Sequence, residues 1–301
     1  MFQNPIIVAI IAIFCCALWG SATPFIKIGY SLMLPHGGVP STMLFAGIRF
    51  TLAGIITVII FSIARRKFLF PKKTSYGKVA TVSLFQTVIQ YIFFYVGLSN
   101  TSGVKGTIAS GSSAFFALLI AALIFRQEKL SVKKIVACIL EFAGIVVVNL
   151  SGLDLTMNFT GDCFVLFSAM SAAFSSVLIK RFSKDEDPVT ISGYQFIIGG
   201  IVMIVIGLAL GGRASVSSVT AFLVLLYLAL LSALAYSLWG ILLKYNSVSK
   251  VTIYNFMTPV FGVLLSSLLL SETSNVVPVN LIITLVLVCG GIIMLNYKKD
   301  A

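Results

Sequence analysis

Long apolar segments separated by short polar loops follow one another along nearly the whole chain. Examples are "NPIIVAIIAIFCCALWG" near the start and "NLIITLVLVCGGIIMLNY" near the end. Apolar runs of about 18 residues or more predict membrane-spanning helices, and the dyad alternation of barrel strands is absent. The sequence therefore predicts an all-α membrane protein of ten transmembrane helices. They are expected at residues 5–30, 41–63, 78–98, 103–125, 132–150, 160–181, 188–210, 218–242, 247–270 and 277–296.

The composition agrees with a lipid-embedded chain. Hydrophobic residues make up 59% of the 301 positions and charged residues 10%, whereas soluble domains carry about 25% charged residues. We expect the first apolar run to be a retained helix, because no positive charge precedes it and it is too long for a signal peptide. The five cysteines lie inside or at the ends of apolar segments without metal or redox spacing, so we expect no metal and no cofactor.

The distribution of basic residues predicts the orientation. If the N-terminus is cytoplasmic, nearly all Lys and Arg fall in cytoplasmic loops, and the outer side holds only Lys27, Lys105 and Arg213. This bias predicts both termini on the cytoplasmic side of an inner membrane in a bacterium-like cell. It also explains the net charge of +12 without a nucleic-acid partner.

The two halves of the chain repeat one another. "GIRFTLAGI" (47–55) aligns with "GYQFIIGGI" (193–201), and "GIVVVNL" (144–150) aligns with "GIIMLNY" (291–297) at nearly the same offset. We expect one five-helix repeat at residues 1–152 and a second at 153–301. Because five is odd, the second repeat would be inverted relative to the first, which is typical of transporters.

Several motifs resemble those of the ten-helix members of the drug/metabolite transporter superfamily, built from two EamA-like repeats. They are "ALWGSATPFIKIGY", "IRF", "YVGLSNTSGVKGTIASGSSAFFALLIAALIFRQEKL" and "YNSVSKVTIYNFMTPVFGVLLSSLLLSETSN". The resemblance implies a substrate pathway between the halves, lined mainly by helices 1, 3, 4, 6, 8 and 9, with helices 5 and 10 peripheral. It also implies alternating access by rocking of the halves.

The first helix carries a cluster of small and polar residues: Trp19, Gly20, Ser21, Thr23 and Pro24. Glycine, hydroxyls and proline together can loosen a membrane helix, which favours a gate or a substrate-facing segment. The alternative is a small-residue packing face between helices. Trp19, Ser21 and Thr23 are candidate substrate-binding residues.

The fourth and ninth helices hold the two most polar intramembrane clusters, at corresponding positions of the repeats. Interrupted helices at matching positions indicate a binding site near the midplane, and ordinary helix packing is the alternative. The candidates here are Ser110, Ser113, Tyr254, Asn255 and Thr258.

The third and eighth helices carry aromatic and amide side chains that match across the repeats. Aromatic walls with a few amides suit a small organic solute, whereas the alternative is anchoring of the aromatic rings at the membrane interface. The candidates are Gln86, Gln90, Tyr91, Phe94, Tyr236 and Trp239, to which we add Ser175 of the sixth helix.

Two charged residues lie deep within predicted helices, Arg49 in the second and Glu141 in the fifth. Such residues face protein or water because charges in the bilayer are costly. Their depths agree within about a turn, so the two could pair, with Glu141 as a structural counter-ion or a proton-accepting coupling group. The alternative is a protonated, hydrogen-bonded Glu141 in a peripheral interface.

The pattern favours a secondary transporter over other classes. Metalloprotease and ATP-binding motifs are absent, which argues against an enzyme, and no repeated filter indicates a channel. We expect a monomer that exports or exchanges a small organic metabolite, such as an amino acid or a related solute. The runner-up is a multidrug or lipophilic amine exporter coupled to protons.

Overall fold

The computed structural model describes residues 2–34, 37–148, 156, 158–269 and 278–296, and every element in these ranges is helical. Each predicted apolar segment coincides with a helical stretch. The elements are α1 (Pro5–Met33), α2 (Val39–Ala64), η1 (Lys73–Ser75), α3 (Tyr76–Ser83), η2 (Leu84–Ile89), α4 (Gln90–Leu98), α5 (Gly103–Gly111), α6 (Ser113–Leu119), η3 (Ile120–Ile124), α7 (Val132–Val148), η5 (Phe159–Cys163), α8 (Phe164–Phe182), α9 (Pro188–Ala209), α10 (Val219–Tyr245), α11 (Val248–Thr252), η6 (Ile253–Phe256), α12 (Met257–Leu269) and α13 (Pro278–Asn296).

The outer surface of the bundle is apolar. Among the described residues, seven helical stretches are long and apolar enough to cross a membrane by length and composition. Large aliphatic side chains on this surface are widely exposed, with Ile63 at 72% and Val132 at 76%. Exposing so much aliphatic surface to water would be unfavourable. The bundle is therefore a multi-pass membrane protein whose exterior faces lipid.

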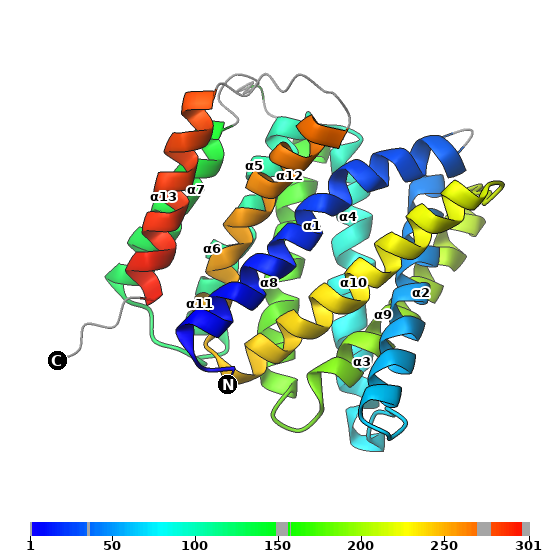
Figure 1. The fold of residues 1–301 in the computed structure, drawn as a ribbon, viewed down its shortest axis with the longest axis horizontal. Helices are drawn as coiled ribbons and strands as arrows, with labels where there is room; N and C mark the ends of the chain where they lie inside the picture. The colour runs from blue at the N-terminus through cyan, green and yellow to red at the C-terminus, as the bar shows by residue number, and fades with distance from the viewer. Residues whose placement is uncertain (1, 35–36, 149–155, 157, 270–277, 297–301) are drawn as a thin grey trace.

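The contacts between helices follow one pattern in both halves. α1 packs against α10 and α12, while α8, its counterpart in the second half, packs against α4 and α6. α2 packs on its own counterpart α9, and α7 packs on its counterpart α13. Figure 1 shows α2 running downward beside the ascending α9, and α13 running downward beside α7. Exchanging the halves therefore maps the contacts of α1 onto those of α8 and maps the α2–α9 and α7–α13 contacts onto themselves.

Glycines allow the backbones of α2 and α9 to approach closely. A Cβ atom on Gly54 would lie 2.5 Å from the carbonyl oxygen of Gly193, a distance that side chains do not tolerate. Small residues at helix interfaces are the usual means of close packing in membranes. Several glycines in the repeated segments 47–55 and 193–201 therefore form a close seam between α2 and α9, one helix from each half.

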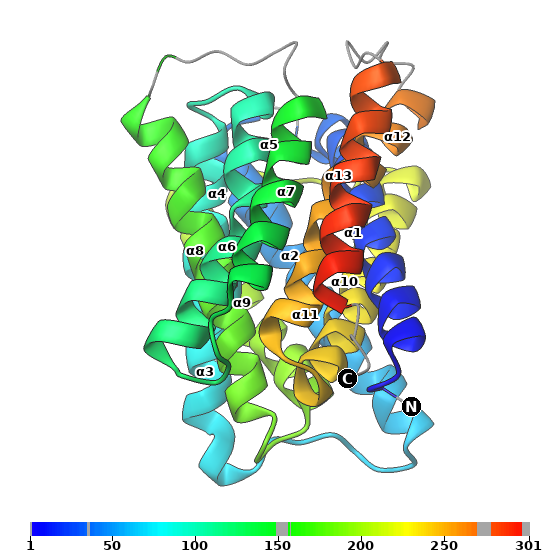
Figure 2. The same cartoon turned by 90° about the vertical axis from the view of Figure 1, so that its left-hand side faces the viewer.

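The pair α7 and α13 lies apart from the centre of the bundle. Figure 2 shows these two helices side by side on the near face, and Figure 1 shows them at the edge of the molecule. The peripheral position expected for the fifth and tenth helices is what the structure shows. Their shared interface contains Glu141, which is fully buried.

Candidate functional site

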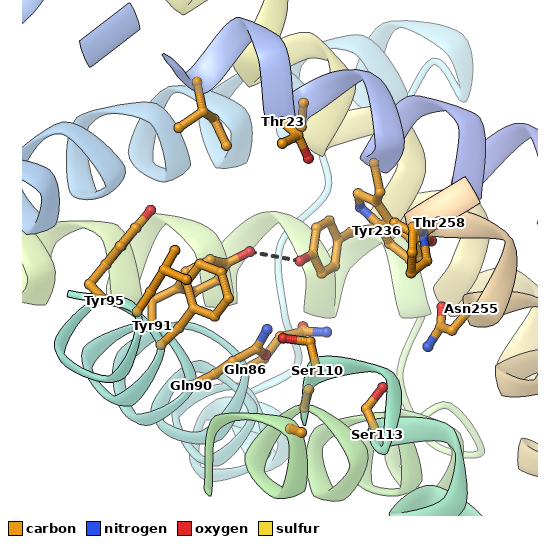
Figure 3. Close-up of a pocket in the computed structure, with 18 of the residues that line it drawn as sticks. Thr23, Gln86, Gln90, Tyr91, Tyr95, Ser110, Ser113, Tyr236, Asn255 and Thr258 are labelled. Carbon is orange, nitrogen blue, oxygen red and sulfur yellow. Dashed lines mark hydrogen bonds between the residues drawn. The ribbon is translucent and has the colours of Figure 1, made fainter. Parts of the chain in front are cut away.

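A cavity of about 450 Å³ lies inside the bundle, lined by α1, α2, η2, α4, α5, α6, α8, α10, η6 and α12. It contains side chains from both halves (Figure 3). Most of the candidate residues line it. They are Trp19, Thr23, Gln86, Gln90, Tyr91, Phe94, Ser110, Ser113, Ser175, Tyr236, Trp239, Asn255 and Thr258.

A π-helical segment places the two glutamines of the third helix. η2 covers Leu84–Ile89 and inserts extra residues into the helical turn, which weakens the regular backbone hydrogen bonding. The hydroxyl of Ser171 on α8 donates a hydrogen bond of 2.6 Å to the carbonyl of Phe85 and so stabilises this segment. Gln86 and Gln90 point into the cavity in Figure 3.

Both predicted interruptions are present, at comparable positions in the two halves. α5 ends at Gly111 and α6 begins at Ser113. Ser112 forms a turn between them, so the α-helix is interrupted at this residue. In the second half, the 3-10 segment η6 joins α11 to α12. Polar side chains next to each interruption line the cavity, among them Ser110, Ser113 and Asn255.

Aromatic side chains form one wall of the cavity. The ring of Trp19 makes edge contacts with Tyr236 at 5.1 Å and with Trp239 at 4.9 Å between centroids. The hydroxyl groups of Tyr91 and Tyr236, which occupy matching positions of the two repeats, are hydrogen-bonded at 3.1 Å (Figure 3). The aromatic residues of the third and eighth helices therefore lie inside the bundle and not at the membrane interface.

Two candidates, Ser21 and Tyr254, do not line the cavity. The Ser21 hydroxyl donates to the carbonyl of Leu18 at 2.8 Å and shares a 2.7 Å hydrogen bond with the Tyr227 hydroxyl. Tyr254 is 2% exposed and packs in the core, where its carbonyl accepts a hydrogen bond from Cys16. Both residues were predicted as members of polar clusters, and the rotation of each helix about its axis directs them into packing contacts.

The first helix has both a packing face and a face that borders the cavity. α1 continues through Pro24 without a break. Gly20 packs on α12, where an added Cβ would lie 2.5 Å from Cβ of Phe261, while Trp19 and Thr23 line the cavity. One face of the small-residue cluster therefore packs and the neighbouring face borders the cavity.

Arg49 lines the cavity, which the sequence did not predict. Its side chain is 3% exposed, and its Nε and Nη2 atoms donate to the hydroxyl of Ser232 on α10 at 3.3 and 2.9 Å. The guanidinium carbon also lies 4.9 Å from the centroid of the Phe50 ring. Other lining residues that the sequence analysis missed are Ala22, Ile26, Lys27, Tyr30, Tyr95, Leu98, Gly111, Ala169, Ala172, Ser176 and Pro259.

The predicted pairing of Arg49 with Glu141 is wrong. Both Glu141 carboxylate oxygens are buried without a hydrogen-bond partner among the described residues. The side chain instead packs on Gly291 of α13, where an added Cβ would lie 2.5 Å from Cγ and Oε1 of Glu141. Equal depth in the membrane is not enough for two residues to pair. Glu141 points from α7 toward α13, whereas Arg49 points from α2 toward α10.

Three polar atoms of cavity-lining residues have no hydrogen-bond partner among the described residues. They are Nε1 of Trp19, Oε1 of Gln86 and Oγ1 of Thr258. Buried polar groups are nearly always paired, so these three atoms are unusual positions in the interior of the bundle. In the described part of the chain, no three His, Cys, Asp or Glu side chains are grouped to hold a metal ion.

A lipid-facing helical bundle around a polar and aromatic cavity defines a membrane transporter. The chain belongs to the EamA-like transporter family of the drug/metabolite transporter superfamily, whose profile matches residues 6–150 and again 159–297. The family and the relatives named below are transporters, which points away from an enzymatic function.

Named relatives agree with this membership. The chain is 26% identical to "Uncharacterized transporter YvbV" of Bacillus subtilis, over 97% of this chain and 92% of the relative. It is also 26% identical to "Probable amino-acid metabolite efflux pump" of Salmonella typhimurium, over 87% of each chain. A solved structure described as "Crystal structure of protein" shares the fold at a TM-score of 0.78 and 17% identity, over 95% of this chain and 97% of that one.

Proposed function

We propose that the protein is a secondary transporter that moves a small organic metabolite across the cytoplasmic membrane by alternating access, as an exporter or exchanger. The observation that carries the proposal is the cavity of about 450 Å³, lined by polar and aromatic side chains from both halves. Pockets of this size suit small organic ligands. An amino acid or a related solute is the substrate we favour, which agrees with the name of the Salmonella relative.

Ten transmembrane helices in two inverted repeats would give such a transporter its two halves. The proposal is supported by the contacts that persist when the halves are exchanged and by the opposite directions of α7 and α13 (Figure 1). Inverted repeats allow one structure to adopt two mirror-related states, each open to one side. The pathway lies within one chain, so a monomer would suffice for transport.

The orientation that we propose puts both termini in the cytoplasm. The end of the bundle that carries the start of α1 also carries most of the basic loops, which favours the cytoplasmic side. At that end Glu128, which follows η3, accepts a 3.0 Å hydrogen bond from the backbone of Ser249 on α11 and pairs with Lys134 at 2.5 Å. The cavity lining instead extends toward Lys27 and Leu98 at the opposite end. We therefore assign the structure to a state closed toward the cytoplasm.

Transport by purified protein in proteoliposomes tests this function. Radiolabelled amino acids and organic acids would be offered, with protein-free liposomes as background. Saturable uptake that is accelerated by unlabelled solute on the opposite side indicates a carrier. Uptake proportional to concentration would indicate a channel, and the absence of any flux would contradict the transport proposal.

A matched pair of variants ties the flux to the cavity. Thr23→Trp places a large side chain in the cavity, where Thr23 faces the glutamines (Figure 3), and is expected to abolish uptake. Ile6→Trp changes a residue of the same helix that is 69% exposed on the outer surface, and uptake should persist. Equal uptake by both variants would place the pathway elsewhere.

A further inference from the structure

We propose that Arg49 binds the carboxylate of the transported substrate, so that the substrates are organic acids or amino acids and not amines that lack a carboxylate. The inference rests on the proposed transport function and names its substrate class. It also assigns to Arg49 a binding role in place of the pairing with Glu141.

The first observation is the charge of the cavity wall. Arg49 lines the cavity, and none of the described lining residues is Asp or Glu. A buried positive charge in a partly enclosed wall favours anionic groups and repels cations. A lipophilic amine would place its ammonium group beside this guanidinium.

The second observation is the incomplete pairing of Arg49. Ser232 is the acceptor that its guanidinium contacts, and no carboxylate of the described chain forms an ion pair with it. Nη1 makes no hydrogen bond to a described residue. A guanidinium has five N–H donors, and a buried charge without a counter-ion is unfavourable, so an anionic ligand that binds it gains both pairing and hydrogen bonds.

The residues around Arg49 would complete an anion site. Tyr30, Tyr95 and Tyr236 line the same cavity as Arg49. Tyrosine hydroxyls donate hydrogen bonds to carboxylate oxygens. The Tyr91 hydroxyl, hydrogen-bonded to that of Tyr236, adds a further hydroxyl to this group.

The other residues of the cavity wall indicate what the rest of the substrate, apart from its carboxylate, is like. Trp19, Phe94 and Trp239 provide apolar and aromatic surface, while Gln86 and Gln90 contribute amide side chains to the lining. The site therefore suits a carboxylate with an apolar side chain, with or without an amino group. An amino acid and its des-amino acid share the carboxylate, so both are expected to bind.

Binding to the purified full-length protein in detergent tests the inference. The probes are matched sets that keep one carbon skeleton: phenylalanine, hydrocinnamate and phenethylamine, with equivalent sets for leucine, methionine and tyrosine. Ligand-induced stabilisation against heat reports binding, and competition with uptake in proteoliposomes reports transport. Carboxylates of at least one set should bind and compete, whereas the amines should not. If the amines bind as well as the carboxylates, or if no carboxylate binds, the inference is overturned.

Variants then place the carboxylate at Arg49. Arg49→Gln should weaken carboxylate binding on the order of thirtyfold or more. Arg49→Lys keeps the charge without the two-pronged geometry, so it should bind with intermediate affinity. Ser232→Ala is the control for the hydrogen bonds between Arg49 on α2 and Ser232 on α10. This variant should bind carboxylates with an affinity near that of the unmodified protein.

The outcomes separate this inference from the transport proposal. If the unmodified protein transports carboxylates and Arg49→Gln transports them equally well, the role of Arg49 is refuted while transport stands. If Ser232→Ala and Arg49→Gln lose stability and binding to the same extent, Arg49 only joins α2 to α10 through Ser232 and does not bind the ligand. If Arg49→Gln does not fold, Arg49→Lys decides, because unchanged carboxylate affinity in this variant would contradict a site that depends on the guanidinium group.

Discussion

Gly47 of α2 and Gly200 of α9 contact each other reciprocally. A Cβ on Gly47 would lie 2.8 Å from the carbonyl oxygen of Gly200, and a Cβ on Gly200 would lie 2.8 Å from the carbonyl oxygen of Gly47. In the sequence, however, Gly47 aligns with Gly193 and Gly200 aligns with Gly54. The counterparts of this pair, Gly193 and Gly54, also contact each other, which is the pattern of a two-fold, self-complementary interface.

This seam predicts that a methyl group at Gly47 is poorly tolerated. Gly47→Ala would force its Cβ against the backbone nitrogen of Ile204 at 2.7 Å and the carbonyl oxygen of Gly200, neither of which belongs to a flexible side-chain end. We expect a loss of about 1–3 kcal/mol in stability, measured as thermal or denaturant unfolding in detergent micelles. Gly290→Ala is the matched control, because a Cβ there meets nothing within 4 Å. Equal stability of both variants would contradict the close seam.

The hydrogen bond between Tyr91 and Tyr236 predicts a measurable coupling between the halves. Tyr91→Phe and Tyr236→Phe each remove one hydroxyl of the 3.1 Å contact and leave the rings in place. A double-mutant cycle on unfolding free energy should give a coupling of about 0.5–1.5 kcal/mol. Tyr76→Phe, which removes a hydroxyl from an exposed tyrosine on α3, should show no coupling to Tyr236→Phe. Additive effects of the first pair would show that the contact does not stabilise the structure.

Helix spans and the location of the polar clusters could be predicted from the sequence. Apolar runs define where a chain crosses lipid, since each backbone group must be hydrogen-bonded within the helix. The repeat offset also predicted that Tyr91 and Tyr236 are counterparts, although it did not predict that their hydroxyls meet. That contact depends on how the halves dock, which no local pattern determines.

The rotation of each helix about its axis was the main feature that the sequence could not supply. α2 and α9 show almost no amphipathic pattern, because one side faces lipid and the other faces apolar protein. Depth along a helix follows from spacing, which is why Arg49 and Glu141 were matched in depth. Their directions follow from packing partners, namely Ser232 for Arg49 and Gly291 for Glu141.

The contact between Glu141 and Gly291 predicts a compensating pair of substitutions. Gly291→Ala would place a Cβ 2.5 Å from the Glu141 side chain and 2.9 Å from the carbonyl of Ala137, which should cost about 1–3 kcal/mol of stability. Glu141→Ala in the same chain removes the first overlap and should restore part of the loss. If the double variant is less stable than Gly291→Ala, the two side chains do not compete for space.

The same location predicts that Glu141 is dispensable for transport. Glu141→Gln keeps the shape of the side chain and removes its ability to ionise, and Glu141 does not line the cavity. Uptake by this variant in proteoliposomes should equal that of the unmodified protein across the pH range. Loss of uptake in a well-folded Glu141→Gln protein would instead favour a proton-accepting role for this residue.

A pair of residues at the proposed cytoplasmic end predicts a pH-dependent effect on stability. Lys78 Nζ lies 2.5 Å from Asp185 Oδ2, and this hydrogen bond holds the pKa of Asp185 below its usual value. An Asp pKa that is lower in the folded state than the unfolded value of about 3.9 contributes stability above that value and loses it as the pH falls through the folded pKa. Asp185→Asn should therefore lower the melting temperature slightly at neutral pH, and the difference should disappear in acid.

Salt and a partner variant provide the controls for Asp185. The carboxylate is exposed, so high salt should also reduce the difference between Asp185→Asn and the unmodified protein at neutral pH. Lys78→Met should produce the same neutral-pH change, and the double variant should lose no more than either single variant, because both substitutions remove one interaction. A difference that grows as the pH falls would have the wrong sign for a carboxylate stabilised by Lys78.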